Sequence, residues 1–236
     1  MKFFATEILT DFVGLFYPRY CFACNLGLAK GEETVCTACM LDLPRTDYHI
    51  NPDNALFRRL EGRVRLQFAT AFLLFRKRGK VQHLLHQLKY NNHPEIGQTL
   101  GRVYGEDLRQ HHIDEKIDAI IPVPLHRSRK RRRGYNQSTE FGKGLSESLQ
   151  KPCYDDVLVR ITKTETQTRK TKLMRWQNVK EVFHVAQPEE LHEKNVLLVD
   201  DVITTGATIE ACVNMLLNAG CKSVSIASIA YTDEGK

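Results

Sequence analysis

The sequence predicts an α/β fold with a parallel sheet and flanking helices, preceded by a small module built around four cysteines. From residue 81 onward, short apolar strands alternate with segments of helical periodicity, which is typical of a parallel sheet. The four cysteines form two closely spaced pairs within residues 18–45. The chain has 236 residues, enough for one well-buried domain of about 150–200 residues and an appendage. We therefore expect two parts, residues 1–45 and residues 46–236.

The composition is that of a folded protein with a moderate excess of positive charge. Apolar residues make up 42% of the chain and charged residues 26%, values that are ordinary for a folded soluble protein. The formal net charge is +6 and the isoelectric point is near 8.9. This balance weakly favours anionic partners such as phosphates or nucleic acid, and it does not choose between them.

The N-terminal segment, residues 1–17, has apolar residues at helical spacing, interrupted by Glu7 and Asp11. No apolar run reaches the roughly 18 residues that a transmembrane segment needs. No small-residue cleavage site follows a charged start, so no signal peptide is predicted. We expect a short amphipathic helix that docks on the body of the protein, with a helix on a membrane surface as the alternative. Without a secretion signal, the seven cysteines indicate a reduced, cytoplasmic protein.

The other elements are predicted from periodicity and turn residues. Residues 46–80 are expected to connect the two parts and to contain a strand pair, with residues 68–75 as its second half. Helices are expected at residues 81–90, 95–110, 138–149 and 207–218, with Gly220 as the cap of the last one. Strands are expected at residues 117–123, 157–161, 182–185, 195–199 and 222–230. Residues 163–179 are polar and lack a clear period, which predicts a mobile loop.

Two C-x2-C pairs, separated by eleven residues, comprise Cys21, Cys24, Cys36 and Cys39. This spacing places four thiolates around one tetrahedral ion and is typical of zinc. Two disulfides fit a reduced protein less well, and a thioredoxin-like redox pair occurs singly near a βαβ unit. Sulfur would fill all four ligand positions, so the predicted zinc site is structural and leaves no open position for chemistry. Iron is the alternative metal.

The most informative segment is Val196–Thr208, in which an apolar strand is followed by two acids and a short polar loop. The polar residues of this segment are Asp200, Asp201, Thr204, Thr205 and Thr208, with Gly206 and Ala207 between the threonines. A helix that starts at such a loop presents free N–H groups and a positive dipole end to an anion. Gly206 lets the backbone come close to that anion. Carboxylates beside such a cradle suit the vicinal hydroxyls of a sugar, or Mg²⁺ between carboxylate and phosphate.

Two other classes of protein have a similar strand. Receiver domains of response regulators also begin with Leu-Val-Asp-Asp, but they need most of a domain after the acids, and 35 residues follow Asp201 here. The strand of a Walker B motif is similar too. However, the chain contains no G-x4-G-K-[ST] sequence, which argues against a P-loop nucleotide site.

The segment Val196–Thr208 resembles the motif with which type I phosphoribosyltransferases bind 5-phosphoribosyl 1-diphosphate (PRPP). This resemblance implies the fold of that family, with Asp200 and Asp201 holding the ribose hydroxyls. It also implies that Thr204–Thr208 cradles the 5′-phosphate and that Mg²⁺ accompanies PRPP.

Two further stretches strengthen this resemblance. Ile121–Arg129 resembles the strand and diphosphate loop of these enzymes, which implies that Leu125, His126 and Arg127 contact PRPP. Residues 160–167, with Arg175, Asn178 and Phe183, resemble the flexible loop of the amidophosphoribosyltransferases. Such a loop would close over the diphosphate and exclude water during transfer.

Four features together resemble the ComF/GntX family, and the resemblance extends from about residue 12 onward. They are the cysteine pairs, the Pro-Val-Pro strand end, the Arg-Gly-Tyr-Asn-Gln sequence at residues 133–137 and the C-terminal motif. The family is linked to natural DNA uptake, which implies single-stranded DNA and a DNA-uptake helicase as partners. One departure is that Leu125–Arg133 replaces the small glycine-containing loop of true amidophosphoribosyltransferases. The glutaminase domain and its N-terminal cysteine nucleophile are lacking as well. A PRPP-binding protein of DNA uptake is therefore favoured. The alternative is an enzyme that transfers phosphoribosyl from PRPP to an amine or base and releases diphosphate.

A basic run at His126–Arg133 contains six Arg or Lys among eight residues. One diphosphate needs fewer cations, and single-stranded DNA would use the excess with salt-dependent affinity. We expect Arg127 and Arg129 to lie near the diphosphate. Nucleic acid would then meet the solvent-facing remainder of the run, which comprises Lys130, Arg131, Arg132 and Arg133. A solvated loop without a partner is the alternative, and no aromatic residues for base stacking are obviously interleaved with the run.

Overall fold

The computed structural model describes residues 18–160 and 183–233. The expected helix at residues 1–17 and the expected loop at residues 163–179 lie outside this part of the chain. The main sheet has four strands in the order β1-β6-β5-β2, and every neighbouring pair is parallel. Its strands are β1 (Ala69–Leu74), β2 (Ala119–Pro122), β5 (Asn195–Ile203) and β6 (Ser223–Tyr231). The predicted parallel sheet is confirmed.

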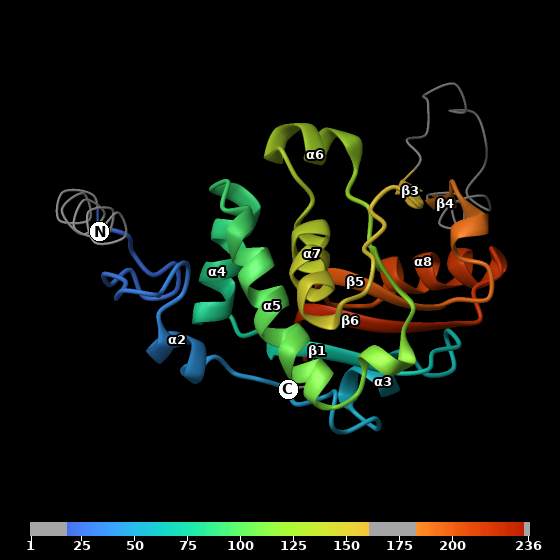
Figure 1. Ribbon diagram of the computed structural model, residues 1–236, viewed down its shortest axis with the longest axis horizontal. Coiled ribbons are helices and arrows are strands. Elements are labelled where there is room, and N and C mark those ends of the chain that lie inside the picture. The colour runs from blue at the N-terminus through green and yellow to red at the C-terminus, as the bar shows by residue number, and fades with distance from the viewer. Residues whose placement is uncertain (1–17, 161–182, 234–236) are drawn as a thin grey trace, which may run out of the picture.

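Helices cover both faces of this sheet because β5 is apolar on both sides. Leu197 and Val199 belong to one hydrophobic core, whereas Val196 and Leu198 belong to the other. This is the alternation of successive side chains along a strand. The first core is completed by α4 (Lys80–Tyr90), α5 (Pro94–Gln110) and α7 (Gln137–Leu149), which lie side by side in Figure 1. The second core is completed by α3 (Ala55–Leu60) and α8 (Ala207–Asn218).

Helices α5 and α7 touch backbone to backbone, because glycines line their contact. A Cβ added to Gly144 would overlap the carbonyl oxygen of Gln98 and lie 2.8 Å from the nitrogen of Arg102. A Cβ added to Gly101 would overlap the carbonyl oxygen of Phe141. A side chain at either position would push the helices apart and disturb the apolar packing around them.

Replacing Gly144 by alanine is expected to destabilise the protein by about 3 kcal/mol, the upper part of the range for overpacking in a core. This loss outweighs the ~1 kcal/mol that alanine gains in intrinsic helix propensity. Urea unfolding measures it. Gly27→Ala is the control, because a Cβ at Gly27 meets nothing within 4 Å. Equal stability of the two variants would contradict the close packing of α5 and α7.

The connector at residues 46–80 differs from its prediction. It contains α3 and the single strand β1, so the expected strand pair is wrong. Asn54 begins α3, because its side chain accepts a hydrogen bond from the Phe57 N–H at 2.9 Å. Leu56 and Leu60, four residues apart, then form the buried side of the helix. The backbone N–H of Thr46 instead donates to the carbonyl of Phe72, and Arg45 forms an isolated bridge with Leu73. The segment that pairs with β1 on this side therefore lies where the cysteine module joins the connector.

Five further elements lie in the described residues of the α/β part. The strands near residues 158 and 183 form a separate antiparallel pair, β3 (Leu158–Arg160) and β4 (Phe183–Val185), outside the main sheet. The basic run forms a helix, α6 (Arg127–Arg133). Two 3-10 turns, η1 (Asp114–Lys116) and η5 (Pro188–Glu190), are the remaining elements among the described residues of the α/β part.

The cysteine module packs directly on the α/β part. Its helix α2 (Thr37–Asp42) and its loops contribute Cys21, Val35, Cys39 and Leu43 to the same core that receives α4 and α5. Pro44 accepts a hydrogen bond from the N–H of Leu74 in β1 at 2.8 Å. The domain boundary near residue 45 stays a prediction. Within the described ranges, no helix combines the length and the apolar character needed to cross a membrane.

Candidate PRPP site, basic helix and metal centre

The two acids lie within β5, which continues to Ile203 rather than ending before them. Asp200 accepts hydrogen bonds through Oδ1 from the Ser138 hydroxyl at 3.0 Å and from the Asp201 N–H at 2.8 Å. Asp201 forms an ion pair with Lys89, whose Nζ lies 3.0 Å from Oδ2. The Asp201 side chain is 17% exposed. Residues from α4 and α7 therefore fix both carboxylates at the edge of the sheet.

The environment of Asp200 disfavours a charged carboxylate. Burial and the neighbouring charge of Asp201 raise its pKa to about 7, although the hydrogen bonds from Asp201 N–H and Ser138 and the charge of Lys89 act in the opposite direction. A ligand that offers hydroxyl donors or positive charge would stabilise the charged form of this carboxyl group. The acid pair therefore suits sugar hydroxyls or a hydrated divalent cation.

The loop after β5 offers unused donors to an anion. In the described part of the chain, the N–H groups of residues 205–208 donate to no acceptor, and residues 204, 205, 207 and 208 are exposed. Helix α8 begins just after Gly206, which has a left-handed φ of 79°. A Cβ at Gly206 would also lie 2.6 Å from Leu60 Cδ2, so both backbone angle and space favour glycine. Free N–H groups at a helix start form an anion cradle.

Two arginines of the connector brace this loop, and sequence reasoning missed both of them. Arg59 donates to the carbonyl of Thr204 at 2.7 Å, and Arg63 donates to the carbonyl of Thr205 at 2.8 Å. Arg63 also forms a 2.6 Å ion pair with Glu210 on α8. Because Arg59 of α3 and Arg63 just after it hold the carbonyls, the loop has its N–H groups left for a ligand. No spacing in the sequence relates the arginines to a loop more than 140 residues away.

The residues predicted to contact diphosphate leave the same edge of the sheet as the acids. Strands β2 and β5 are parallel neighbours, with Pro122 paired to Val199, so Leu125 and Arg127 follow β2 where Asp200 follows Val199. A cavity of about 440 Å³ opens here. Its lining comprises Pro124, Leu125, Arg127, Lys130, Asn136, Thr139, Asp155, Leu158, Val159 and Arg160. His126 does not line it, because its Nδ1 caps α6 by accepting from the Ser128 N–H at 3.3 Å.

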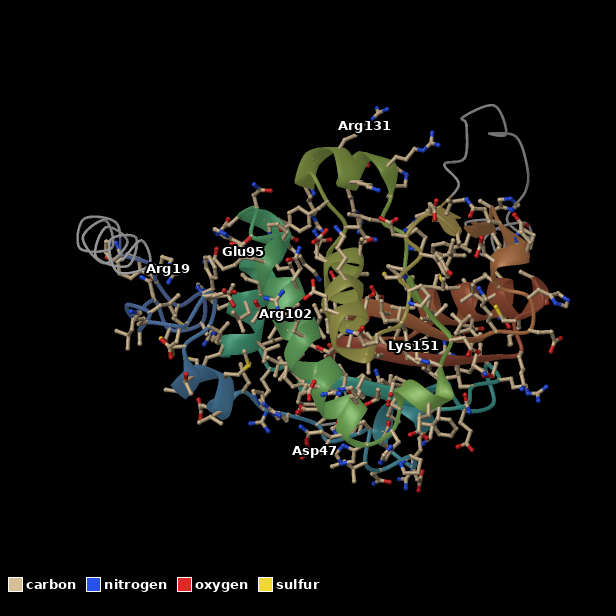
Figure 2. The ribbon with its side chains drawn as sticks, in the orientation of Figure 1. Arg19, Asp47, Glu95, Arg102, Arg131 and Lys151 are labelled. Atoms are coloured by element: carbon tan, nitrogen blue, oxygen red, sulfur yellow. The ribbon has the colours of Figure 1, made fainter. Side chains whose placement is uncertain are left out.

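Helix α6 divides the basic run by face rather than by position along the chain. Lys130 lies one turn after Arg127 and lines the same cavity, so the expected separation between Arg129 and Lys130 is not the one observed. The helical period explains this, since residues three apart share a face. Residues 131–133 instead line a second cavity. Figure 2 shows Arg131 extending from α6 away from the rest of the molecule.

The four cysteines of the N-terminal module come together as the spacing predicts. The sulfur atoms of Cys21, Cys24, Cys36 and Cys39 all lie within 4.8 Å of one another. Cys24 and Cys36 are 3.9 Å apart, close to the ~3.8 Å between sulfurs that tetrahedral bonds of ~2.3 Å require. The N–H of Cys36 also donates to Cys21 Sγ at 3.2 Å, as amide groups do to a ligating thiolate.

The pKa values of two thiols of this cluster, Cys21 and Cys39, are shifted in opposite directions. Burial raises the pKa of Cys21, but N–H groups of Cys36, Cys24 and Ala23 outweigh it and lower that pKa to about 7. Burial and the neighbouring thiols raise the pKa of Cys39 to about 12. A bound metal ion would relieve this conflict, and the donor set fits one. The described cysteines outside the cluster form no disulfide.

Residues 86–236, more than half of the chain, match the phosphoribosyl transferase domain model. The chain belongs to this family. The match includes β2, β5, β6 and the helices between them, and the parallel sheet with its flanking helices is the type I phosphoribosyltransferase fold. The fold that the sequence motif implied is therefore confirmed.

The relatives with similar sequences include competence proteins. Competence protein F of Haemophilus influenzae is 34% identical over 151 residues, which is 62% of this chain and 66% of that protein, just under two thirds of its length. DNA utilization protein YhgH of Escherichia coli K12 is 27% identical over 230 residues, 91% of this chain and 98% of that protein. Competence protein ComFC of Bacillus subtilis is 28% identical over 218 residues, 86% and 85% of the two chains. The resemblance to the ComF family is confirmed, and the chain is a phosphoribosyltransferase-like protein.

Proposed function

We propose that this protein binds PRPP and acts in the cytoplasm in the uptake or use of DNA, with single-stranded DNA held by α6. The observation that carries PRPP binding is the acid pair next to four unused N–H groups at one sheet edge. The DNA role is supported by the relatives named for competence and DNA utilization and by the basic helix nearby. A DNA-uptake helicase as a further partner rests on the family resemblance.

In this proposal each part of PRPP contacts a different segment of the protein. The 5′-phosphate accepts from the N–H groups of residues 205–208 and from the threonine hydroxyls, at the positive end of α8. The ribose hydroxyls donate to Asp200, while Lys89 keeps Asp201 neutralised. The diphosphate lies toward Leu125 and Arg127. When bound, Mg²⁺ neutralises charge on the diphosphate, and the two carboxylates offer it the oxygen ligands that it prefers.

Calorimetric titration with PRPP and Mg²⁺ tests the proposal. Ribose 5-phosphate, which lacks the diphosphate, and diphosphate alone are the matched ligands. Because the proposed site contacts both ends of PRPP, we expect PRPP to bind at least tenfold more tightly than either fragment. Equal affinity for PRPP and diphosphate would mean that cationic residues alone bind the anion, and it would overturn the site.

The basic helix makes a separate prediction about salt. Neutralising Arg131 and Arg132 to glutamine should weaken binding of single-stranded DNA and lower the slope of log affinity against log salt by roughly 1.4, at about 0.7 per phosphate contact. Lys130 is left unchanged, because it lines the other cavity. The affinity for PRPP should stay within a factor of two, about 0.4 kcal/mol.

The matched control neutralises Arg76 and Lys77, two exposed cations just before α4. They precede the first turn of that helix. The helix rises about 15 Å from its start at Lys80 to its end at Tyr90 beside α6. The control removes the same charge and should leave the salt slope unchanged. An equal change of slope in both variants would mean that net charge, not α6, binds the DNA.

An active phosphoribosyltransferase is the second candidate, favoured by the 440 Å³ cavity beside the diphosphate loop, which offers room for an acceptor. An acceptor nitrogen would attack C1 of PRPP, the bond from C1 to the diphosphate oxygen would break, and the acceptor proton would pass to water. Diphosphate release in the presence of amines and nucleobases measures this reaction. Release that does not depend on any acceptor would show hydrolysis alone.

A further inference from the structure

A second cavity, of about 440 Å³, lies between the end of α4 and the basic helix α6. Its lining comprises Lys89, Tyr90, Asn92, Arg131, Arg132, Arg133 and Gly134. Four of these seven residues are cationic and none is acidic, and one of the four, Lys89, is also paired with Asp201. The tertiary fold creates this combination, because about 40 residues separate the two lining segments along the chain. A cavity of this charge and size suits a phosphate-bearing ligand as large as a nucleotide.

The unusual member of this lining is Tyr90, the last residue of α4. Its side chain is among the few large apolar ones that are exposed, with 60% of its surface open to solvent. The guanidinium of Arg133 lies 5.2 Å from the centre of the ring, and the His86 ring centre lies 4.9 Å away. Both contacts hold the tyrosine ring in place while leaving most of it uncovered. An aromatic ring fixed beside several cations is how proteins bind unpaired nucleobases.

The wall formed by Arg133 has unused donors. Arg133 donates through NH1 to Gln137 at 2.8 Å, yet its Nε is buried and has no hydrogen-bond partner among the described residues. The Nε2 group of Gln137 is also buried and unpartnered. Both orphan groups are donors, and an unsatisfied buried donor costs stability. These unpaired donors next to the cavity add to its preference for an anion over a cation.

We propose that this cavity binds one nucleotide of single-stranded DNA, with its base stacked on Tyr90 and its flanking phosphates on Arg131 and Arg132. The inference rests on the proposed function and deepens it, because it adds a base-binding position to a helix that otherwise contacts only the backbone. Duplex DNA keeps its base faces stacked inside the helix, so the cavity selects single strands. A free nucleotide has the same chemistry, and the experiment separates the two ligands.

The test compares a short oligothymidylate, an abasic oligonucleotide of the same length and free thymidine monophosphate, each titrated by fluorescence anisotropy or calorimetry. Tyr90→Leu should weaken oligothymidylate binding by about tenfold, within the range for one base stacked on an aromatic side chain. The salt slope should stay the same, because no phosphate contact is lost. Tyr90→Phe keeps the ring and should restore the affinity. Neither variant should change binding of the abasic strand.

Two results with Tyr90→Leu would overturn the inference while leaving the proposed function intact. One is an oligothymidylate affinity of Tyr90→Leu equal to that of the wild type. The other is an equal loss for the abasic strand, which would assign the effect to the fold or to the phosphates. Thymidine monophosphate that binds as tightly as the oligonucleotide would identify a free nucleotide as the ligand instead. Failure of the wild type to bind any oligonucleotide would instead refute the DNA-binding part of the proposed function.

Discussion

Asp200→Asn and Asp201→Asn are each expected to reduce PRPP affinity by about tenfold or more, the scale of one lost charge-assisted hydrogen bond. Their effects on folding should be opposite. Asp201→Asn leaves Lys89 without its partner, so the free energy of unfolding should fall by about 1–3 kcal/mol. Asp200→Asn removes a carboxyl that burial destabilises and still accepts from Ser138, so the free energy of unfolding should rise at pH 8. Calorimetry measures the affinities and urea unfolding the stabilities.

The gain in Asp200→Asn depends on pH with a definite sign. The pKa of Asp200 is raised from 3.8 to about 7, so the folded state disfavours its charged form. This destabilisation is absent below the unfolded pKa near 3.8, grows as the pH rises, and is complete above about pH 7. The variant should therefore match the wild type near pH 3.5 and exceed it at pH 8 by up to ~4 kcal/mol, since the shift from 3.8 to about 7 spans about three pKa units of about 1.4 kcal/mol each. A gain that did not vary with pH would contradict the raised pKa.

Removal of metal from the cysteine cluster should have the largest effect on stability. We propose one structural zinc ion per chain, and Cys21→Ser should lose it and lower the free energy of unfolding by at least about 3 kcal/mol, because metal binding to such a site is folding energy. The damage should reach the α/β part, since Cys21 and Cys39 share a core with α4 and α5. Metal analysis with thermal unfolding, before and after a chelator, measures both effects.

Cys153→Ser is the matched control, because Cys153 is half-buried and lies outside the cluster. It should keep one equivalent of metal and an unfolding temperature close to that of the wild type. A metal-free wild-type protein with an unchanged unfolding temperature would refute the structural role. Iron in place of zinc would change the metal but not the role.

Features whose parts are neighbours along the chain could be predicted from the sequence. The two cysteine pairs span nineteen residues from Cys21 to Cys39, and their spacing alone brings four sulfurs together. The segment from Val196 to Thr208 is also continuous, so its strand, acids and loop could be recognised in order. Helix α6 had local signals that were not used, since His126 caps its start and Gly134, with a φ of 83°, ends it. Helix α3 likewise had Asn54 as its cap.

The residues that complete the sites from distant parts of the chain are brought together by folding. Lys89 meets Asp201, Ser138 meets Asp200, and Arg59 braces the loop at Thr204, although no sequence spacing relates the members of these pairs. The sequence showed no aromatic residue within the basic run, yet packing of α4 beside α6 supplies Tyr90. The physical reason is that periodicity fixes which face a residue occupies within its own element. The partner on that face depends on how the elements pack, which only the folded chain specifies.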